Sequence, residues 1–165
     1  MIESTDITIE LIDLIEMWEP RLKSLSEEKI TGPRNTQNRS IKMILGHLID
    51  SSSNNIHRII HLQNLPSPLT FPNYASLGNN DRWIAIQNYQ SEDWNDMIQL
   101  WKYSNFHLCH IIRNADKSKF DKEWIAGPGR LISLKDMITD YLRHFKLHLS
   151  EINDLISTQV LPKNN

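Results

Sequence analysis

The stretch "SLKDMITDYLRHFKLHLSEINDLI", residues 133–156, has a helical period and contains two histidines four residues apart. Its apolar residues recur at three- and four-residue steps, which places them on one face of an α-helix. Ser133, with Asp136 three residues later, resembles a capping box, so a helix is predicted to begin there. The predicted apolar face consists of Leu134, Met137, Ile138, Tyr141, Phe145, Ile152, Leu155 and Ile156.

Three further segments have the same period and are predicted to be helices over about residues 6–26, 40–64 and 91–114. Ser40 and Ser91 are the expected N-caps of the second and third. Their apolar faces are Leu11, Ile15, Trp18, Leu22 and Leu25 in the first; Ile41, Ile44, Leu45, Leu48, Ile49, Ile56, Ile59 and Ile60 in the second; and Trp94, Met97, Ile98, Trp101, Asn105, Leu108 and Ile112 in the third.

The connections between these helices have loop composition. Residues 27–38 are polar, and "LPSPLTFPNYASLGNND" (65–81) holds three prolines, as in ordered loops that cover a pocket. Residues 81–90 are predicted to form a short helix. The stretch 115–132 is predicted to be irregular, and its "GPGR" lacks phosphate-loop spacing and is expected to be a turn. Four amphipathic helices predict an all-α protein, a four-helix bundle in a single domain over residues 1–165.

The composition limits the functional class. The 165 residues are 39% hydrophobic and 23% charged, with a net charge of −2 and no run of Lys and Arg, so a nucleic-acid partner is not expected. No apolar run is long enough to span a membrane. The single cysteine, Cys109, excludes an internal disulfide and fits a reducing compartment. The start, "MIESTDIT", lacks signal-peptide character, and the expected location is cytoplasmic.

The seven histidines differ in helical phase, which is more informative than their spacing. Four of them, His57, His61, His107 and His110, fall nearly opposite the apolar face of their helix and are predicted to be surface residues. His148 lies within about 40° of the middle of its stripe, and His144 lies at the margin.

Two imidazoles on adjacent turns of a core face need partners for their ring nitrogens. One metal ion is one solution, because imidazoles at i and i+4 can converge on a cation. Donation to carbonyls or water in a polar pocket is the other solution, and this helix alone does not decide between them.

His47 is the remaining candidate ligand, although it lies about 130° from the middle of its stripe. It heads a polar seam at steps of seven, four, three and four residues. Such a seam lines a cavity or faces water, and phase alone slightly favours water. The seam consists of Ser40, His47, Ser51, Asn54 and Arg58.

Three blocks of the sequence together resemble the DinB-like (DinB/YfiT) family, whose members are described as metalloenzymes. The blocks are "RSIKMILGHLIDSSSNNIHRII" (39–60), "FPNYASLGNNDRWIAIQNYQSEDWNDMIQLWKYSNFHLCHII" (71–112) and "ITDYLRHFKLHLSEI" (138–152). The similarity covers about residues 7–156. Its most specific part combines "GHLIDS" on the second helix with H-x3-H on the last.

The resemblance implies a four-helix bundle and a divalent metal site, with nickel or zinc as the expected ion. Carried over by position, the ligands are His47, His144 and His148. His47 then points inward, and Ser51, Asn54 and Arg58 become pocket candidates. Two departures concern the substrate: Arg39 replaces a usual Trp, and "YASLGNNDRW" is longer than the usual loop.

Three neutral ligands leave a divalent ion its full charge and open positions, the arrangement of a catalytic site. Such an ion lowers the pKa of bound water, giving a hydrolase, or deprotonates a coordinating thiol, giving a thiol transferase. The resemblance favours the transferase, with a low-molecular-weight thiol as co-substrate beside a small-molecule substrate. A non-catalytic helical binding module is the alternative of a different class.

Further side chains have weaker signals. Asp140, one turn before His144, is the candidate catalytic base or orienting group, although a solvent-exposed carboxylate fits equally well. Asp50 is more simply a surface residue and Cys109 a core residue. Relatives in this family often form homodimers, so the resemblance implies that this chain can dimerise. The tryptophan-rich third helix is a candidate contact.

Overall fold

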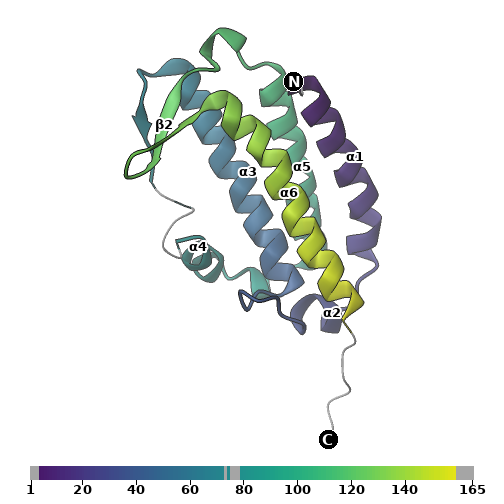
Figure 1. The fold of residues 1–165 in the computed structure, drawn as a ribbon. Coiled ribbons are helices and arrows are strands. Elements are labelled where there is room, and N and C mark those ends of the chain that lie inside the picture. The colour runs from purple at the N-terminus through teal and green to yellow at the C-terminus, as the bar shows by residue number, and fades with distance from the viewer. Residues whose placement is uncertain (1–3, 73, 75–78, 159–165) are drawn as a thin grey trace, which may run out of the picture.

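The computed structural model describes residues 4–72, 74 and 79–158 of the chain. In this part, four long helices form a bundle (Figure 1): α1 (Ser4–Lys23), α3 (Ile41–Asn64), α5 (Trp94–Arg113) and α6 (Leu134–Ser157). α3 packs against α5 and α6, and α1 packs against the same two helices. The order around the bundle is therefore α1, α5, α3, α6. The predicted all-α four-helix bundle is confirmed.

The helix starts are set by side-chain caps, two of them where the sequence predicts. Ser40 caps α3 by accepting a hydrogen bond from the Met43 N–H at 3.3 Å. Ser133 caps α6, and its Oγ accepts from the Asp136 N–H at 3.0 Å. Both helices that carry the candidate ligands thus begin at serines visible in the sequence.

The predicted cap of the third helix is wrong. Asp93, not Ser91, caps α5, because its carboxylate accepts from the Asp96 N–H at 3.0 Å. Ser91 instead ends a 3-10 turn, η1 (Tyr89–Ser91). Asp is as good an N-cap as Ser, so the two candidates were not separable by residue type.

The core is built from the predicted apolar stripes. The stripe residues of α5 are all buried, and those of α6 are buried except Ile156, which is partly exposed. Trp101 of α5 stacks on Phe145 of α6, with ring centroids 5.8 Å apart. The prediction that Ile60 of α3 belongs to the buried stripe is wrong. This residue is 49% exposed, because it lies on the outer side of that helix.

The predicted loops contain more regular structure than expected. The first helix ends at Lys23, and a separate short helix, α2 (Glu27–Thr31), lies within the predicted 27–38 loop. Pro20 is accommodated inside α1 on its exposed side. The predicted short helix at 81–90 is present as α4 (Asn79–Gln87) followed by η1.

The stretch 115–132, predicted to be irregular, contains a 3-10 turn, η2 (Lys117–Lys119), and most of a small sheet. Strand β2 (Glu123–Gly127) pairs antiparallel with β3 (Arg130–Ser133) and parallel with β1 (Leu69–Thr70). The "GPGR" stretch makes the turn between β2 and β3, as predicted, with Gly129 at a φ of 68°.

This hairpin lies beside the C-terminal end of α3 and the start of α6 (Figure 1). Its residues Trp124, Ala126 and Leu131 line a cavity whose walls also include residues of α3 and α6. In the described part of the chain, no helix combines the length and apolar character needed to cross a membrane.

Candidate metal centre

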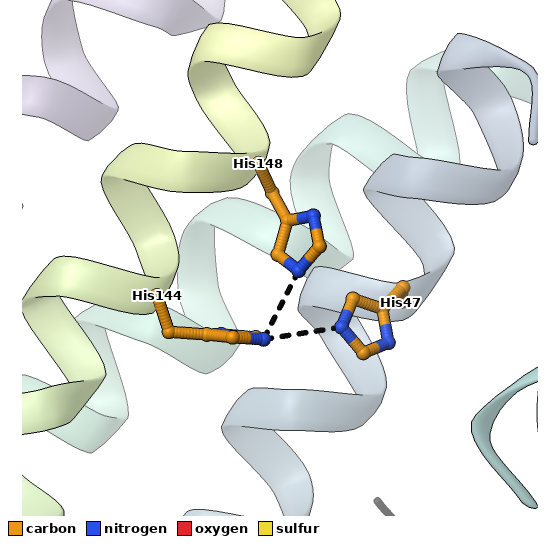
Figure 2. Close-up of side chains that lie close together, drawn as sticks. All are labelled: His47, His144 and His148. Atoms are coloured by element: carbon orange, nitrogen blue, oxygen red, sulfur yellow. Dashed lines mark hydrogen bonds between the residues drawn. The ribbon is translucent and has the colours of Figure 1, made fainter. Parts of the chain in front are cut away.

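Three histidine rings converge in the bundle, one from α3 and two from α6 (Figure 2). The Nε2 atom of His144 lies 3.2 Å from that of His47 and 3.0 Å from that of His148. Two nitrogens bound about 2.0–2.1 Å from one tetrahedral ion would be about 3.3 Å apart. The spacing of the three nitrogens therefore fits a shared ion.

All three rings are carried by regular α-helix. His144 and His148 are separated by one turn of α6, so their side chains leave the same face. His47 comes from the second turn of α3, directly after Gly46. A Cβ on Gly46 would lie 2.2 Å from Cδ2 of Tyr89, so glycine permits the ring of Tyr89 to pack against α3 at this point.

Each of the three rings has a neighbour for its other nitrogen. Nδ1 of His148 lies 2.8 Å from Oε2 of Glu151, and Nδ1 of His47 lies 2.7 Å from the hydroxyl of Tyr74. Nδ1 of His144 faces Oγ of Ser51 at 3.5 Å.

The carboxylate of Glu151 can only accept a hydrogen bond, so it holds the proton of His148 on Nδ1 and leaves the Nε2 lone pair free. Tyr74 Oη can donate to the carbonyl oxygen of His47, 3.4 Å away, and accept from Nδ1–H of the same residue. With this tautomer, the Nε2 lone pairs face one another, and an ion between them gives each lone pair a partner.

Burial keeps the imidazoles neutral. His47 is 3% exposed and His148 is 5% exposed. Burial lowers the pKa of His47 to about 2 and that of His144 to about 4, in both cases with a further contribution from neighbouring histidines. Burial also lowers the pKa of His148, against the opposing effect of Glu151. Neutral imidazole is the form that binds a metal ion.

A cavity of about 900 Å³ adjoins the three rings. Its walls come from α3, α6, Tyr74 and the β2–β3 hairpin. Of the predicted pocket residues, Ser51 and Arg58 line it, but Asn54 does not. Asn55 lines it instead. Both amides donate to the carbonyl oxygen four residues earlier, Asn54 to Asp50 at 2.9 Å and Asn55 to Ser51 at 2.8 Å.

Asp140, predicted as a catalytic base or orienting group, lies at the cavity wall but is 59% exposed. Its Oδ1 accepts from Nε of Arg143 at 2.6 Å, and the hydroxyl facing Nδ1 of His144 belongs to Ser51. The orienting role is thus not supported by the hydrogen bonds between described residues. A role as base stays a prediction.

Asp50 and Cys109 do not line the cavity beside the three rings. Asp50 is buried rather than on the surface as expected, and it accepts hydrogen bonds from Gln87 at 2.6 Å and Tyr89 at 2.8 Å. Cys109 is 1% exposed, and burial raises its pKa to about 11, as expected of a core thiol.

The other four histidines join no group of three metal-binding side chains among the described residues. His57, His107 and His110 are exposed and His61 is partly exposed, in agreement with their phase.

Sequence reasoning missed four contributors to this region: Tyr74, Glu151, Asn55 and Trp124. Glu151 had a readable signal, since it follows His148 by three residues on a helix and so shares its face. Tyr74 belongs to the 65–81 stretch predicted to cover a pocket, of which residues 73 and 75–78 lie outside the described part. Trp124 belongs to a strand that was not predicted.

The sequence departs from the family pattern at two places, and the structure explains the first, Arg39 in place of a usual Trp. Arg39 is 2% exposed, and its guanidinium is paired with the Asp81 carboxylate of α4 at 2.6 Å. It lines the cavity and ties the start of α3 to α4. Of the longer loop, "YASLGNNDRW" (74–83), residues 75–78 lie outside the described part, and residues 79–83 belong to α4.

No protein-family model matches this sequence, and no curated protein matches it. A solved structure does match: YfiT from Bacillus subtilis superimposes with a TM-score of 0.73 over 90% of this chain and 85% of its own. This chain has the YfiT fold. The two sequences are 16% identical, so the match establishes the fold alone. YfiT itself is described as "a probable metal-dependent hydrolase with an unusual four-helix bundle topology".

Proposed function

We propose that this chain is a divalent-metal-dependent enzyme whose ion is held by Nε2 of His47, His144 and His148. The observation that carries the proposal is the approach of these three nitrogens to one another, at 3.0 and 3.2 Å, while each Nδ1 has a neighbour of its own. A metal site with oriented imidazoles has this arrangement. Nickel and zinc are the proposed ions, because both accept imidazole ligands.

The donor set favours catalysis over structural support. Structural zinc sites close the coordination shell with four protein ligands, whereas three neutral histidines leave positions open. Here the open side adjoins a cavity of about 900 Å³, large enough for a small molecule. When bound, such an ion activates water or a thiol as a nucleophile.

Hydrolysis is the first candidate reaction, supported by the description of YfiT. Transfer of a low-molecular-weight thiol is the second, supported by the resemblance to DinB-like proteins. In either case the chain holds the ion with three imidazoles and positions the rings through Tyr74, Ser51 and Glu151. Asp140, at the cavity wall, is the proposed proton acceptor in both reactions.

The test compares metal-free protein with protein reloaded with zinc or nickel. A panel of esters, amides and phosphoesters is assayed alone for hydrolysis, and a panel of alkyl and epoxide electrophiles is assayed with small thiols for transfer. The proposal expects turnover that requires metal and is lost in His144→Ala. Metal-independent turnover contradicts the metal-dependent mechanism. No turnover in either panel with metal-loaded protein favours the non-catalytic binding module.

A further inference from the structure

Arg58 lines the same cavity as the three histidines, three helical turns beyond His47 on α3. Its side chain is 7% exposed, and its Nη2 atom is buried without a hydrogen-bond partner among the described residues. None of the ion pairs formed by described residues includes it. A guanidinium carries five donors and a permanent charge, so this is an unusual state for a buried arginine.

Trp124 of β2 supplies a second buried donor without a hydrogen-bond partner among the described residues. Its side chain is 5% exposed, it lines the cavity, and its indole Nε1 is also buried without a partner. The guanidinium carbon of Arg58 lies 4.3 Å from the centroid of this indole ring. Two side chains in contact, one charged and one neutral, therefore line the cavity, and each has an unpaired donor.

Leaving a buried donor unpaired costs about 1–3 kcal/mol, and more for a charged group. An acceptor from a molecule in the cavity would remove this cost at both positions. The other charged groups of the cavity wall have partners or face water. Arg39 pairs with Asp81, Arg143 with Asp140, and Glu151 with His148. Asp136 accepts a hydrogen bond from Ser133, and Arg130 is exposed. The unmet demand is thus concentrated at Arg58 and Trp124, and it is a demand for an oxyanion.

We propose that Arg58 and Trp124 bind a carboxylate of the substrate, or of its co-substrate, while the reacting group lies at the three histidines. This inference rests on the proposed function for the role of the histidines. One positive charge with one neutral donor matches a monoanion better than a phosphate dianion, which is usually held by several charged donors. The partner is therefore an elongated carboxylic acid.

The length of that acid follows from the helix. Arg58 follows His47 by 11 residues, about 16 Å along α3 at 1.5 Å per residue. Helical side chains lean toward the N-terminus, which brings the guanidinium back toward the histidines, so the two ends are separated by on the order of 10 Å. A chain of six to eight methylene-sized units spans roughly this distance.

Binding calorimetry on the full-length protein tests the proposal with matched probes. Suberic acid monohydroxamate carries a metal-binding head and a terminal carboxylate, and its primary amide replaces only the carboxylate. In zinc-loaded protein the acid is expected to bind at least about tenfold more tightly than the amide. Equal affinities overturn the proposal, and this comparison needs no variant.

Arg58→Gln is expected to abolish the preference for the acid and leave the affinity for the amide unchanged. Arg143→Gln is the matched control, because that arginine is paired and 68% exposed, and it should keep the preference. Circular dichroism checks the fold of each variant. Should Arg58→Gln not fold, Trp124→Phe keeps the ring under the guanidinium, loses the N–H, and is expected to reduce the preference severalfold.

Binding measurements on metal-free protein distinguish a failure of the carboxylate site from a failure of the proposed metal site. Octanoate is compared with octanamide and octylphosphonate on chelator-treated protein, where the hydroxamate head has no role. A preference for octanoate that needs Arg58 supports the carboxylate site even when no metal binds. Metal binding with no such preference in either arm overturns the carboxylate site alone, and a stronger preference for octylphosphonate overturns the carboxylate assignment.

Discussion

Glu151 Oε2 lies 2.8 Å from His148 Nδ1, with the two residues three positions apart on α6. The same carboxylate accepts a hydrogen bond from the Asn35 amide at 3.3 Å, so it is fixed from a second side. It directs the imidazole of His148 so that Nε2 faces the other two rings. In metal sites, such outer partners fix ring orientation and raise ligand basicity.

Glu151→Gln is therefore expected to weaken zinc binding about 10- to 100-fold, because the amide no longer supplies a charged acceptor for Nδ1–H. Competition with a chromophoric chelator measures the change. Asp154→Asn, an exposed position on the same helix, is the control and should bind zinc as the wild type does. Unchanged affinity in Glu151→Gln would mean that this contact does not orient a ligand.

Tyr74→Phe removes the hydroxyl that lies 2.7 Å from Nδ1 of His47. We expect weaker zinc binding than in wild type, with a smaller loss than in Glu151→Gln because the tyrosine acceptor is neutral. The same titration measures it. Tyr103→Phe, which alters a side chain 60% exposed on α5, should have no effect. A loss of equal size in both variants contradicts the role of Tyr74.

The buried histidines should make the metal-free protein sensitive to acid. Their folded pKa values are lowered, to about 4 for His144 and about 2 for His47, so below pH 6.5 the unfolded chain binds more protons than the folded one. Stability is then complete above about pH 6.5 and falls by up to about 1.4 kcal/mol per pH unit per histidine as the pH drops.

Urea unfolding between pH 7 and pH 5 measures this dependence, in a range above most carboxylate titrations. His47→Gln removes one of the linked groups, so its slope should be shallower than that of wild type. His57→Ala, at an exposed position, should keep the wild-type slope. Identical slopes in all three proteins would contradict the burial of His47.

Gly46→Ala should destabilise the protein by about 1–3 kcal/mol, although alanine favours helix by about 1 kcal/mol. The added Cβ would lie 2.2 Å from Tyr89, whose hydroxyl is held by Asp50 at 2.8 Å and Gln87 at 3.0 Å. Gly127→Ala is the control, because its Cβ would meet nothing within 4 Å. Chemical unfolding compares the two, and equal stabilities would show that the Tyr89 ring yields.

The helices could be predicted from sequence because their stripes and caps are local signals. Ser40 and Ser133 cap the helices that carry the candidate ligands, as their positions indicated. The sheet could not be predicted, since β1 has two residues and β2 pairs with it from a distant part of the chain. Strands of this length have too few residues for a period to emerge.

The inward orientation of His47 could not be predicted from helical phase, for a physical reason. A helical-wheel projection assumes that a helix has one buried face, but α3 packs against α5, α6, α4 and η1. From Ile41 to Ser52 every residue except Met43 is buried, so a position about 130° from the stripe can still face the interior. The family resemblance, rather than phase, pointed to its inward orientation. His148 was readable because α6 keeps a polar outer face.

The proposed metal site needs one ion held jointly by α3 and α6, and metal analysis after zinc or nickel loading tests this most directly. Wild type and His61→Ala should each retain about one ion per chain after desalting, while His148→Ala and His47→Ala should retain almost none. His61 is the matched control because it closes an H-x3-H pair on α3, with rings 6.2 Å apart. Wild-type protein that retains no ion, or folded His47→Ala and His148→Ala proteins that retain as much as wild type, would contradict it.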